Sequence, residues 1–286
     1  MVEPMMFSQR TRKRFGQHWL TSEKVLHAML EAAAVTRQDC VLEIGAGTGV
    51  LTKWLMPLAD AVVAVEIDWD LCRRLQNQFA QVDNFRLVQG DVLGLDLGAI
   101  APAKDFPFGP PNKVVANIPY YITGPILETL LGSLATPNPN PYDTIVLLVQ
   151  KEVAERLYAK PGTKAFGALS VRVQYLAACR LVCPVPAKAF RPPPKVDSAV
   201  VQLTPRPLAT PAVDPEGLNQ LVTLGFRSKR KMLRNNLKGI CDRDSLTTLM
   251  TQLGIADTAR AEDLSVDQWV ALANQLGQGN KNLEES

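Results

Sequence analysis

The stretch VLEIGAGTGVLT, residues 41–52, decides the fold, because it runs from a short apolar segment through three glycines into a helical pattern. Gly45, Gly47 and Gly49 occupy alternate positions, and glycine allows both a tight turn and the close approach of a ligand to the backbone. The N–H groups at the start of the following helix can bind an anionic group. The spacing differs from the G-x-G-x-x-G pattern of pyrophosphate-binding loops. It is compatible with a ligand-binding loop or with a simple tight turn.

Strands and helices alternate on both sides of this loop. The sequence predicts strands at residues 40–44, 61–67, 85–88, 113–116 and 144–149, and helices at residues 24–34, 51–58, 70–80 and 123–134. Strands separated by helices predict right-handed β-α-β units and a parallel sheet that is covered on both faces. The predicted fold class is therefore α/β, with a Rossmann-like doubly wound sheet.

The pattern changes after residue 160. A helix is predicted at residues 167–178, followed by strands at 181–185 and 198–203. The segment TPRPLATPAVDPEG, residues 204–217, is rich in proline and is typical of a linker. Residues 218–276 then read as helices alone, with breaks near Gly239 and Gly254. We predict a catalytic domain at residues 1–206 and a small all-helical domain at residues 207–286.

Two acidic residues follow the second and third predicted strands. Glu66 ends the second strand, 17 residues after Gly49, where a carboxylate can accept both hydroxyl groups of a ribose. Asp91, at the end of the third strand, can accept a hydrogen bond from an adenine amino group. Each residue alone could be a helix N-cap, but successive strand ends outline one ligand crevice. A crevice with acceptors for a ribose and for an adenine, and without the pattern of a phosphate-binding loop, fits S-adenosylmethionine.

The fourth predicted strand ends in VVANIPYYI, residues 114–122, beside that crevice. The Asn117 side-chain oxygen and the Ile118 carbonyl could each accept one N–H bond of an exocyclic amine and turn its lone pair toward a methyl donor. Pro119 stiffens the turn, and Tyr120 can stack on an extruded base. Orientation and electrostatics would then supply most of the rate gain. The alternative is a plain turn, because Asn-x-Pro is common in turns.

Composition limits the remaining possibilities. The 286 residues carry a net charge of +3, five cysteines without a C-x-x-C pair, and two histidines. This pattern predicts no disulfide framework, no metal site and a reducing cytoplasmic location. No apolar run is long enough to predict a membrane-spanning helix. Basic residues nevertheless cluster twice, which indicates contacts with phosphates or two solvated faces: Arg10, Arg12, Lys13 and Arg14, then Arg227, Lys229, Arg230, Lys231, Arg234 and Lys238.

Seven segments together resemble the small-subunit ribosomal RNA adenine N6,N6-dimethyltransferases, from about Lys13 to about Ala273: RKRFGQHWL, LEIGAGTGVLT, VEID, GDVL, NIPYYI, FRPPPKVDSAVV and FRSKRKMLRNNL. The resemblance implies a class I S-adenosylmethionine-dependent methyltransferase fold with a helical C-terminal domain. It implies dimethylation of two adjacent adenosines in a hairpin near the 3′ end of small-subunit RNA, and a role in subunit biogenesis. Donor-binding positions would be His18, Leu20, Gly45, Gly47, Glu66, Asp91 and Asn117. Tyr120 and Phe190 would flank the target adenine. The family usually has Asn where this chain has His18.

Three alternatives remain. A large-subunit RNA adenine methyltransferase of the macrolide-resistance type shares the donor loop and the acceptor motif, but the segment FRSKRKMLRNNL favours the small-subunit group. The second alternative is a DNA adenine methyltransferase. It is disfavoured because the acceptor motif of that class usually carries Asp or Asn followed by two prolines. A non-catalytic nucleic-acid-binding relative, such as a transcription factor, is the third. We interpret residues 226–238 as a helix whose basic residues bind RNA phosphates: Arg227, Lys229, Arg230, Lys231 and Arg234.

Overall fold

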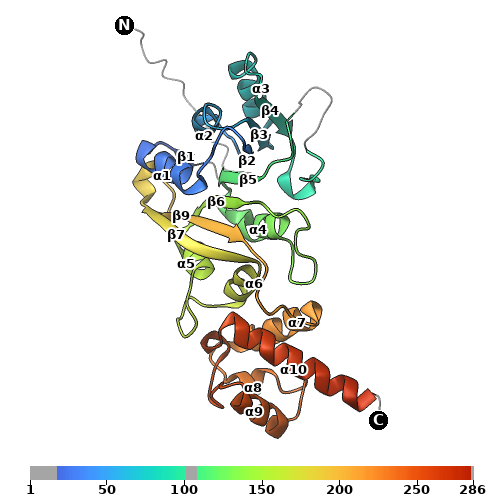
Figure 1. Cartoon of the computed structure of the whole chain (residues 1–286). Coiled ribbons are helices and arrows are strands. Elements are labelled where there is room, and N and C mark those ends of the chain that lie inside the picture. The colour runs from blue at the N-terminus through green and yellow to red at the C-terminus, as the bar shows by residue number, and fades with distance from the viewer. Residues whose placement is uncertain (1–17, 101–107, 285–286) are drawn as a thin grey trace.

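The computed structural model describes residues 18–100 and 108–284, with side chains described up to residue 277 (Figure 1). A seven-stranded sheet forms its centre, in the order β4-β3-β2-β5-β6-β9-β7. Its strands are β2 (Cys40–Ile44), β3 (Ala61–Glu66), β4 (Phe85–Gln89), β5 (Lys113–Asn117), β6 (Thr144–Gln150), β7 (Ala177–Val185) and β9 (Ser198–Pro205). A separate two-stranded pair joins β1 (Trp19–Leu20) to β8 (Phe190–Arg191).

The sheet is parallel over its first five strands and antiparallel at one edge. Strands β2, β3, β4, β5 and β6 pair in parallel, as the alternation of strands and helices predicts. Strand β9 then runs antiparallel to both β6 and β7. The chain returns from β7 to β9 without a crossover helix, and only antiparallel strands can be joined in that way.

Helices cover both faces of the sheet, which explains why its strands are continuous apolar runs. One face packs against α1 (Glu23–Ala33), α2 (Val50–Leu55) and α3 (Trp69–Gln78). The other face packs against α4 (Thr123–Leu131), α5 (Lys151–Leu157) and α6 (Ala168–Leu176). Strands β2, β3 and β6 are fully buried along their centres, so the sheet is rigid where the connecting loops leave it.

Four helices gather at one end of the molecule (Figure 1): α7 (Pro215–Gly225), α8 (Leu233–Asn236), α9 (Arg243–Gln252) and α10 (Val266–Glu284). Trp269 is fully buried among them. The same apolar cluster includes Phe166 and Tyr175, which precede the predicted boundary at residue 206. Arg172 on α6 also donates hydrogen bonds to Asn219 and Thr223 on α7. The helices therefore pack directly on the first part of the chain, and the boundary stays a prediction.

The helix that we predicted at residues 226–238 is wrong. The segment forms a 3-10 turn, η5 (Phe226–Ser228), then a bend, and only then the four-residue helix α8. Met232 has an extended backbone and bridges Arg260, while the Asn236 side chain donates to the carbonyls of Gly225 and Ser228. These contacts replace helical hydrogen bonds, so tertiary packing overrides the local helical preference.

Candidate functional site

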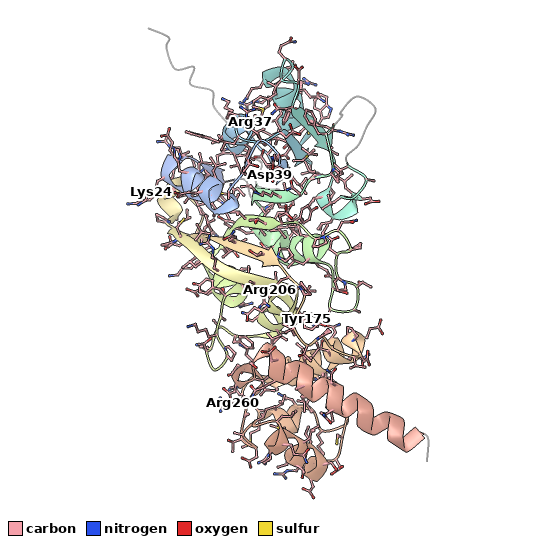
Figure 2. All side chains as sticks on the ribbon, in the orientation of Figure 1. Lys24, Arg37, Asp39, Tyr175, Arg206 and Arg260 are labelled. Atoms are coloured by element: carbon pink, nitrogen blue, oxygen red, sulfur yellow. The ribbon has the colours of Figure 1, made fainter. Side chains whose placement is uncertain are left out.

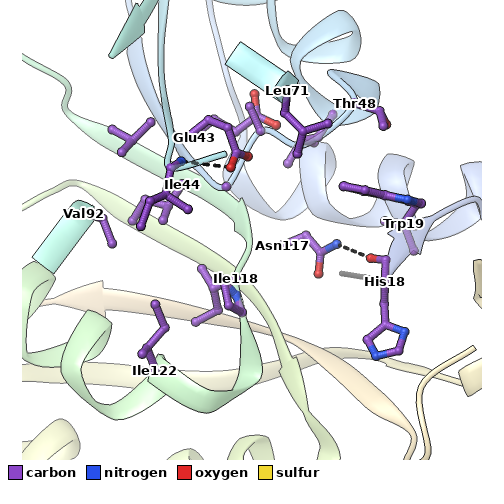
Figure 3. Close-up of a pocket in the computed structure, with 18 of the residues that line it drawn as sticks. His18, Trp19, Glu43, Ile44, Thr48, Leu71, Val92, Asn117, Ile118 and Ile122 are labelled. Carbon is purple, nitrogen blue, oxygen red and sulfur yellow. Dashed lines mark hydrogen bonds between the residues drawn. The ribbon is translucent and has the colours of Figure 1, made fainter. Parts of the chain in front are cut away.

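One pocket lies at the carboxyl ends of the parallel strands, where open α/β sheets bind ligands (Figure 3). Four neighbouring strand ends contribute to it: Glu66 and Asn117 end β3 and β5, and Gly45 and Asp91 lie in the loops after β2 and β4. The structure therefore brings together residues that lie far apart in the sequence. His18, Leu20, Ile118, Pro119 and Tyr120 complete the set of predicted residues that line the pocket.

Gly47 turns the loop after β2 beneath an aromatic side chain. Its φ is +60°, a conformation that favours glycine, and a Cβ placed there would lie 2.5 Å from the Trp19 ring. The Gly47 N–H donates to Oε2 of Glu66 at 2.9 Å. Gly47, although predicted to bind the donor, does not line the pocket itself, whereas Trp19, which the sequence analysis did not single out, does.

Glu66 is held by three backbone N–H groups at the end of β3. Oε2 accepts from Gly47, and Oε1 accepts from Ile67 and Asp68, each at 2.9 Å. Burial raises the pKa of Glu66, and the three backbone hydrogen bonds oppose that rise. Because a carboxylate has about four acceptor positions, the fixed group still has capacity to accept a hydroxyl. The geometry suits the ribose contact that the sequence predicts.

Glu43 is a second acid in the pocket wall that the sequence analysis did not single out. Its Oε2 accepts from the Thr52 hydroxyl at 2.6 Å, and the residue is 1% exposed. Burial raises the pKa of Glu43 to about 8, and the nearby charge of Glu66 contributes to that rise. The sequence signal that could have identified Glu43 is an acidic residue within an otherwise apolar predicted strand. Glu43 lines the pocket, so its protonation state affects the electrostatics there.

Asp91 is exposed at the end of β4 and caps the short turn η2 (Val92–Gly94), accepting from the Leu93 N–H at 3.1 Å. Two apolar side chains stand beside the acids: Ile67 is 46% exposed and Leu93 is 39% exposed. Both line the pocket. Large apolar groups that stay exposed next to hydrogen-bond acceptors suit a flat ligand with a polar edge, such as a purine.

Asn117 stands at the end of β5 with its amide oriented by the backbone of His18. Its Nδ2 donates to the His18 carbonyl at 3.4 Å (Figure 3). No described residue donates to its Oδ1, which leaves that oxygen available to a ligand amine. Ile118 is buried beside it, and Pro119 has the φ of −62° that leads into the turn η3 (Tyr120–Ile122).

Tyr120 and His18 form the outer part of the pocket. The Tyr120 hydroxyl and the Ser198 hydroxyl form a 2.6 Å hydrogen bond, and burial raises the pKa of Tyr120. The His18 Nδ1 donates to the Pro192 carbonyl at 2.7 Å. The two rings lie nearly parallel, at an interplanar angle of 20°, with their centres 6.4 Å apart.

Phe190, which the resemblance places beside the target adenine, lies outside the pocket lining in this structure. It is 1% exposed and does not line the pocket, because β8 pairs with β1 and the Phe190 side chain enters the apolar core. Its register partner is Leu20, which is also buried but lines the pocket floor. The expected contact between Phe190 and a target adenine stays a prediction.

The five predicted RNA-binding residues fall into two groups. Arg227, Arg230 and Lys231 are exposed, and their side chains make no hydrogen bond or ion pair with another described residue. Lys229 donates to the carbonyls of Lys164 and Phe166, and Arg234 pairs with Asp257 at 3.1 Å. Lys229 and Arg234 thus also hold the helical part of the chain together. The basic cluster at residues 10–14 lies outside the described residues.

Residues 18–100 and 108–284 contain no group of three or more His, Cys, Asp or Glu side chains that could hold a metal ion. None of their helices has the length and apolar character needed to cross a bilayer.

Comparison with known proteins gives consistent matches. The family model described as ribosomal RNA adenine dimethylase matches residues 8–278. The chain is 62% identical to the ribosomal RNA small subunit methyltransferase A of Trichormus variabilis, over 94% of this chain and 98% of the relative. The protein of that name from Nostoc punctiforme is 61% identical, over 93% of this chain and 95% of the relative.

Two solved structures share the fold over most of their length. A dimethyladenosine transferase from Plasmodium falciparum has a TM-score of 0.75 and 25% identity, covering 92% of this chain and 98% of that one. The 23S rRNA methyltransferase ErmE has a TM-score of 0.70 and 27% identity, covering 91% of this chain and 100% of that one.

Proposed function

This chain belongs to the ribosomal RNA adenine dimethylase family, and from that premise we propose how its pocket performs the reaction. The chain is a ribosomal RNA methyltransferase that dimethylates adenosines of small-subunit ribosomal RNA at N6. We propose that the substrates are two adjacent adenosines in a hairpin near the 3′ end, that the modification serves subunit biogenesis, and that the protein acts in the cytoplasm.

S-adenosylmethionine, when bound, supplies an electrophilic methyl group attached to a sulfonium. The residues of the crevice fit it. Glu66 keeps acceptor capacity for a ribose hydroxyl, and Asp91 has a second carboxylate oxygen for the adenine amino group. Ile67 and Leu93 offer exposed apolar surface to the purine faces. S-adenosylmethionine carries no phosphate, so the donor site needs no cationic side chain to bind one. This agrees with the glycine spacing of the loop after β2, which differs from that of pyrophosphate-binding loops.

The acceptor site solves a problem of reactivity, because the lone pair of an adenine amino group is delocalised into its ring. In the first of the two transfers, Asn117 Oδ1 and the Ile118 carbonyl accept the two N–H bonds of that amine; in the second, one N–H remains for them to hold. This arrangement rotates the lone pair out of conjugation and toward the donor methyl. The orientation of Asn117 is the observation that carries the proposal, since its Nδ2 is already engaged by His18 and its oxygen remains for the substrate. Preorganised groups of this kind supply much of an enzyme's rate gain.

The subunit preference rests on the curated relatives. Three small-subunit enzymes match at 60–62% identity, whereas the large-subunit enzyme ErmE matches at 27%. The fold alone does not separate the two, because both types share it. A purely structural nucleic-acid-binding protein would not need the oriented amide or the pocket that connects it to Glu66.

We propose that Arg227, Arg230 and Lys231 contact the phosphates of the RNA. All three are exposed on the segment that leads from α7 to α8, and RNA helices are read mainly through shape and backbone. Lys229 and Arg234 act chiefly by fixing that segment, through the carbonyls of the 164–166 loop and through Asp257. The basic segment thus has an exposed, RNA-facing part and an anchored part.

The test measures which ribosomal subunit the protein methylates. Purified protein and methyl-labelled S-adenosylmethionine are incubated with small-subunit and large-subunit particles from cells that lack these modifications. We expect label in small-subunit RNA alone. Label in large-subunit RNA, or equal label in both, would contradict the proposed substrate while leaving methyltransferase activity established.

A further inference from the structure

We propose that the exposed ring of Tyr121 stacks on the nucleotide next to the target adenosine while that adenosine occupies the pocket. The inference rests on the proposed function, because it adds a substrate contact to the acceptor site of that reaction. Tyr121 is not among the residues that the sequence motifs assign to either site, and the methyl transfer at Asn117 does not use it.

Tyr121 combines exposure to solvent with a place in the pocket. Among the described residues, three large apolar side chains are both exposed and part of the pocket lining: Ile67, Leu93 and Tyr121. Ile67 and Leu93 stand beside the acids that suit the donor. Tyr121 is 63% exposed and belongs to the turn that follows Asn117, in the acceptor part of the pocket. A large apolar group that stays in water at a binding site indicates contact with a partner.

The turn η3 directs Tyr120 and Tyr121 to different surroundings. A 3-10 helix has three residues per turn, so neighbouring side chains diverge by about 120°. The Tyr120 hydroxyl is bound to Ser198, which is fully buried at the start of β9. The Tyr121 hydroxyl forms no hydrogen bond with another described residue, and its ring faces solvent. Tyr121 therefore extends the outer part of the pocket toward an approaching substrate.

Extrusion of the target base creates a need for this ring. An enzyme that acts on a base within structured RNA takes that base out of its stack. The neighbouring nucleotide then loses a stacking partner, and an aromatic side chain can replace it. One phosphate joins the two nucleotides, so the neighbour of an adenosine held at Asn117 and Tyr120 stays at the pocket opening, where Tyr121 is exposed. Every base has a flat face, so the same ring serves whichever adenosine is the target.

The same opening carries exposed cations that suit the backbone of the strand. Arg191 is the register partner of Trp19, which lines the pocket. Lys195 lies three residues before Ser198 on the same segment. Both cations are exposed, and neither side chain forms a hydrogen bond or an ion pair with another described residue. Phosphates next to the extruded adenosine would have cationic partners nearby, which favours a nucleotide over an apolar protein segment beside Tyr121.

The experiment compares Tyr121→Ala and Tyr121→Phe with the parent protein. Phenylalanine keeps the ring and removes a hydroxyl that has no described partner. Trp69→Ala is the control, because Trp69 is an aromatic side chain that is 54% exposed and does not line the pocket. Single-turnover methylation of small-subunit particles is measured at saturating donor over a range of particle concentrations, and mass spectrometry of RNA fragments resolves the two adenosines. Calorimetry measures the affinity for S-adenosylmethionine.

Two altered particles identify the base that the ring contacts. In each of them, uridine replaces one of the two adjacent adenosines, so a single target remains and its neighbour on one side has a smaller ring system. The protein variant and the base replacement form a double-mutant cycle, which measures the coupling between Tyr121 and that neighbour. Because the ring lies on one side of the target, coupling is expected in one of the two particles. A structural role of Tyr121 would lower methylation equally on all particles.

We expect Tyr121→Ala to lower methylation at subsaturating particle concentrations by about 5- to 150-fold, the range for loss of one base–aromatic stack, and Tyr121→Phe to keep most of the parent rate. Trp69→Ala should match the parent, and the donor affinity of Tyr121→Ala should stay within about twofold of the parent. On one of the two uridine particles, the loss caused by Tyr121→Ala should be smaller than on the unaltered particle.

Unchanged methylation with Tyr121→Ala, or an equal loss on all three particles, would overturn the inference and leave the proposed function intact. A clear drop in donor affinity with Tyr121→Ala would place the ring in the donor site and would also overturn it. A parent protein that methylates no RNA adenine would refute the proposed function itself.

Discussion

Replacing Gly47 by alanine should damage the protein through two separable effects. The φ of +60° is unfavourable for alanine by about 1–2 kcal/mol. The new Cβ would also lie 2.5 Å from the Trp19 ring, which must move by about 1 Å to restore ordinary contact. Overpacking of this kind costs about 1–3 kcal/mol. We therefore expect Gly47→Ala to lower the free energy of unfolding by about 2–5 kcal/mol.

Two other glycines provide matched controls. Gly162 has a φ of +80° and no atom within 4 Å of the position that a Cβ would take, so Gly162→Ala should show the backbone cost alone. Gly94 has open space and no positive φ, so Gly94→Ala should leave stability unchanged or slightly raised. In a Trp19→Ala background the clash is absent, and Gly47→Ala should then cost no more than Gly162→Ala.

Urea unfolding of these variants measures the stability differences, and calorimetry measures the affinity for S-adenosylmethionine. Gly47→Ala should also weaken donor binding, because displaced Trp19 forms a wall of the pocket and Gly47 donates to Glu66. The reasoning is refuted if Gly47→Ala and Gly162→Ala lose the same stability in the parent background and both leave donor affinity unchanged.

Three further predictions concern charged groups. Glu66→Ala and Asp91→Ala should each weaken donor binding by about 1–3 kcal/mol, and calorimetry showing unchanged affinity in both would remove the ribose and adenine assignments. Burial raises the pKa of Glu43 from 4.5 to about 8, so stability should decline as pH rises through that interval. Glu43→Gln should make this decline shallower in urea unfolding, and an unchanged pH profile would show that Glu43 ionises normally. Reversing the charges of Arg230 and Lys231 should lower the affinity for small-subunit particles and flatten its salt dependence, measured by filter binding.

The control for the charge reversal is the same change at Lys24 and Arg37, which are exposed and lie toward the other end of the molecule from Arg260 (Figure 2). Arg260 bridges Met232, which lies within the basic segment. Equal losses in both double variants would mean that net charge, and not this surface, sets the affinity for the particles.

The five parallel strands could be predicted from the sequence to within about one residue at each end, whereas β7 begins at Ala177, where the sequence analysis still predicted a helix. Strands that are buried on both faces leave unbroken apolar runs, and residues 40–44 match β2 at both ends. The acids at strand ends were also predictable, because parallel strands bring their carboxyl ends to one edge. In the same way, the motif at residues 117–120 had to lie at the same edge of the sheet as Glu66, on the other side of β2.

Other features depend on contacts between residues that lie far apart in the sequence, and no local sequence pattern predicts such contacts. The basic segment was predicted as a helix, but Met232 and Asn236 bind distant backbone groups instead. The bond from His18 to Pro192 spans 174 positions. Ile67 and Leu93 looked like ordinary apolar residues, and their exposure in the pocket follows only from the fold. Phe190 matched its motif, yet its pairing with Leu20 buries the ring.

The most direct test of the central claim is nucleoside mass spectrometry of small-subunit RNA after reaction with the parent protein and with Asn117→Ala. We predict N6,N6-dimethyladenosine at two adjacent positions with the parent. With Asn117→Ala the rate should fall on the order of 10²–10³-fold, since one preorganised acceptor is lost, while urea unfolding stays unchanged. Methylation of another base or atom, or a folded Asn117→Ala variant that reacts at nearly the parent rate, would contradict the account.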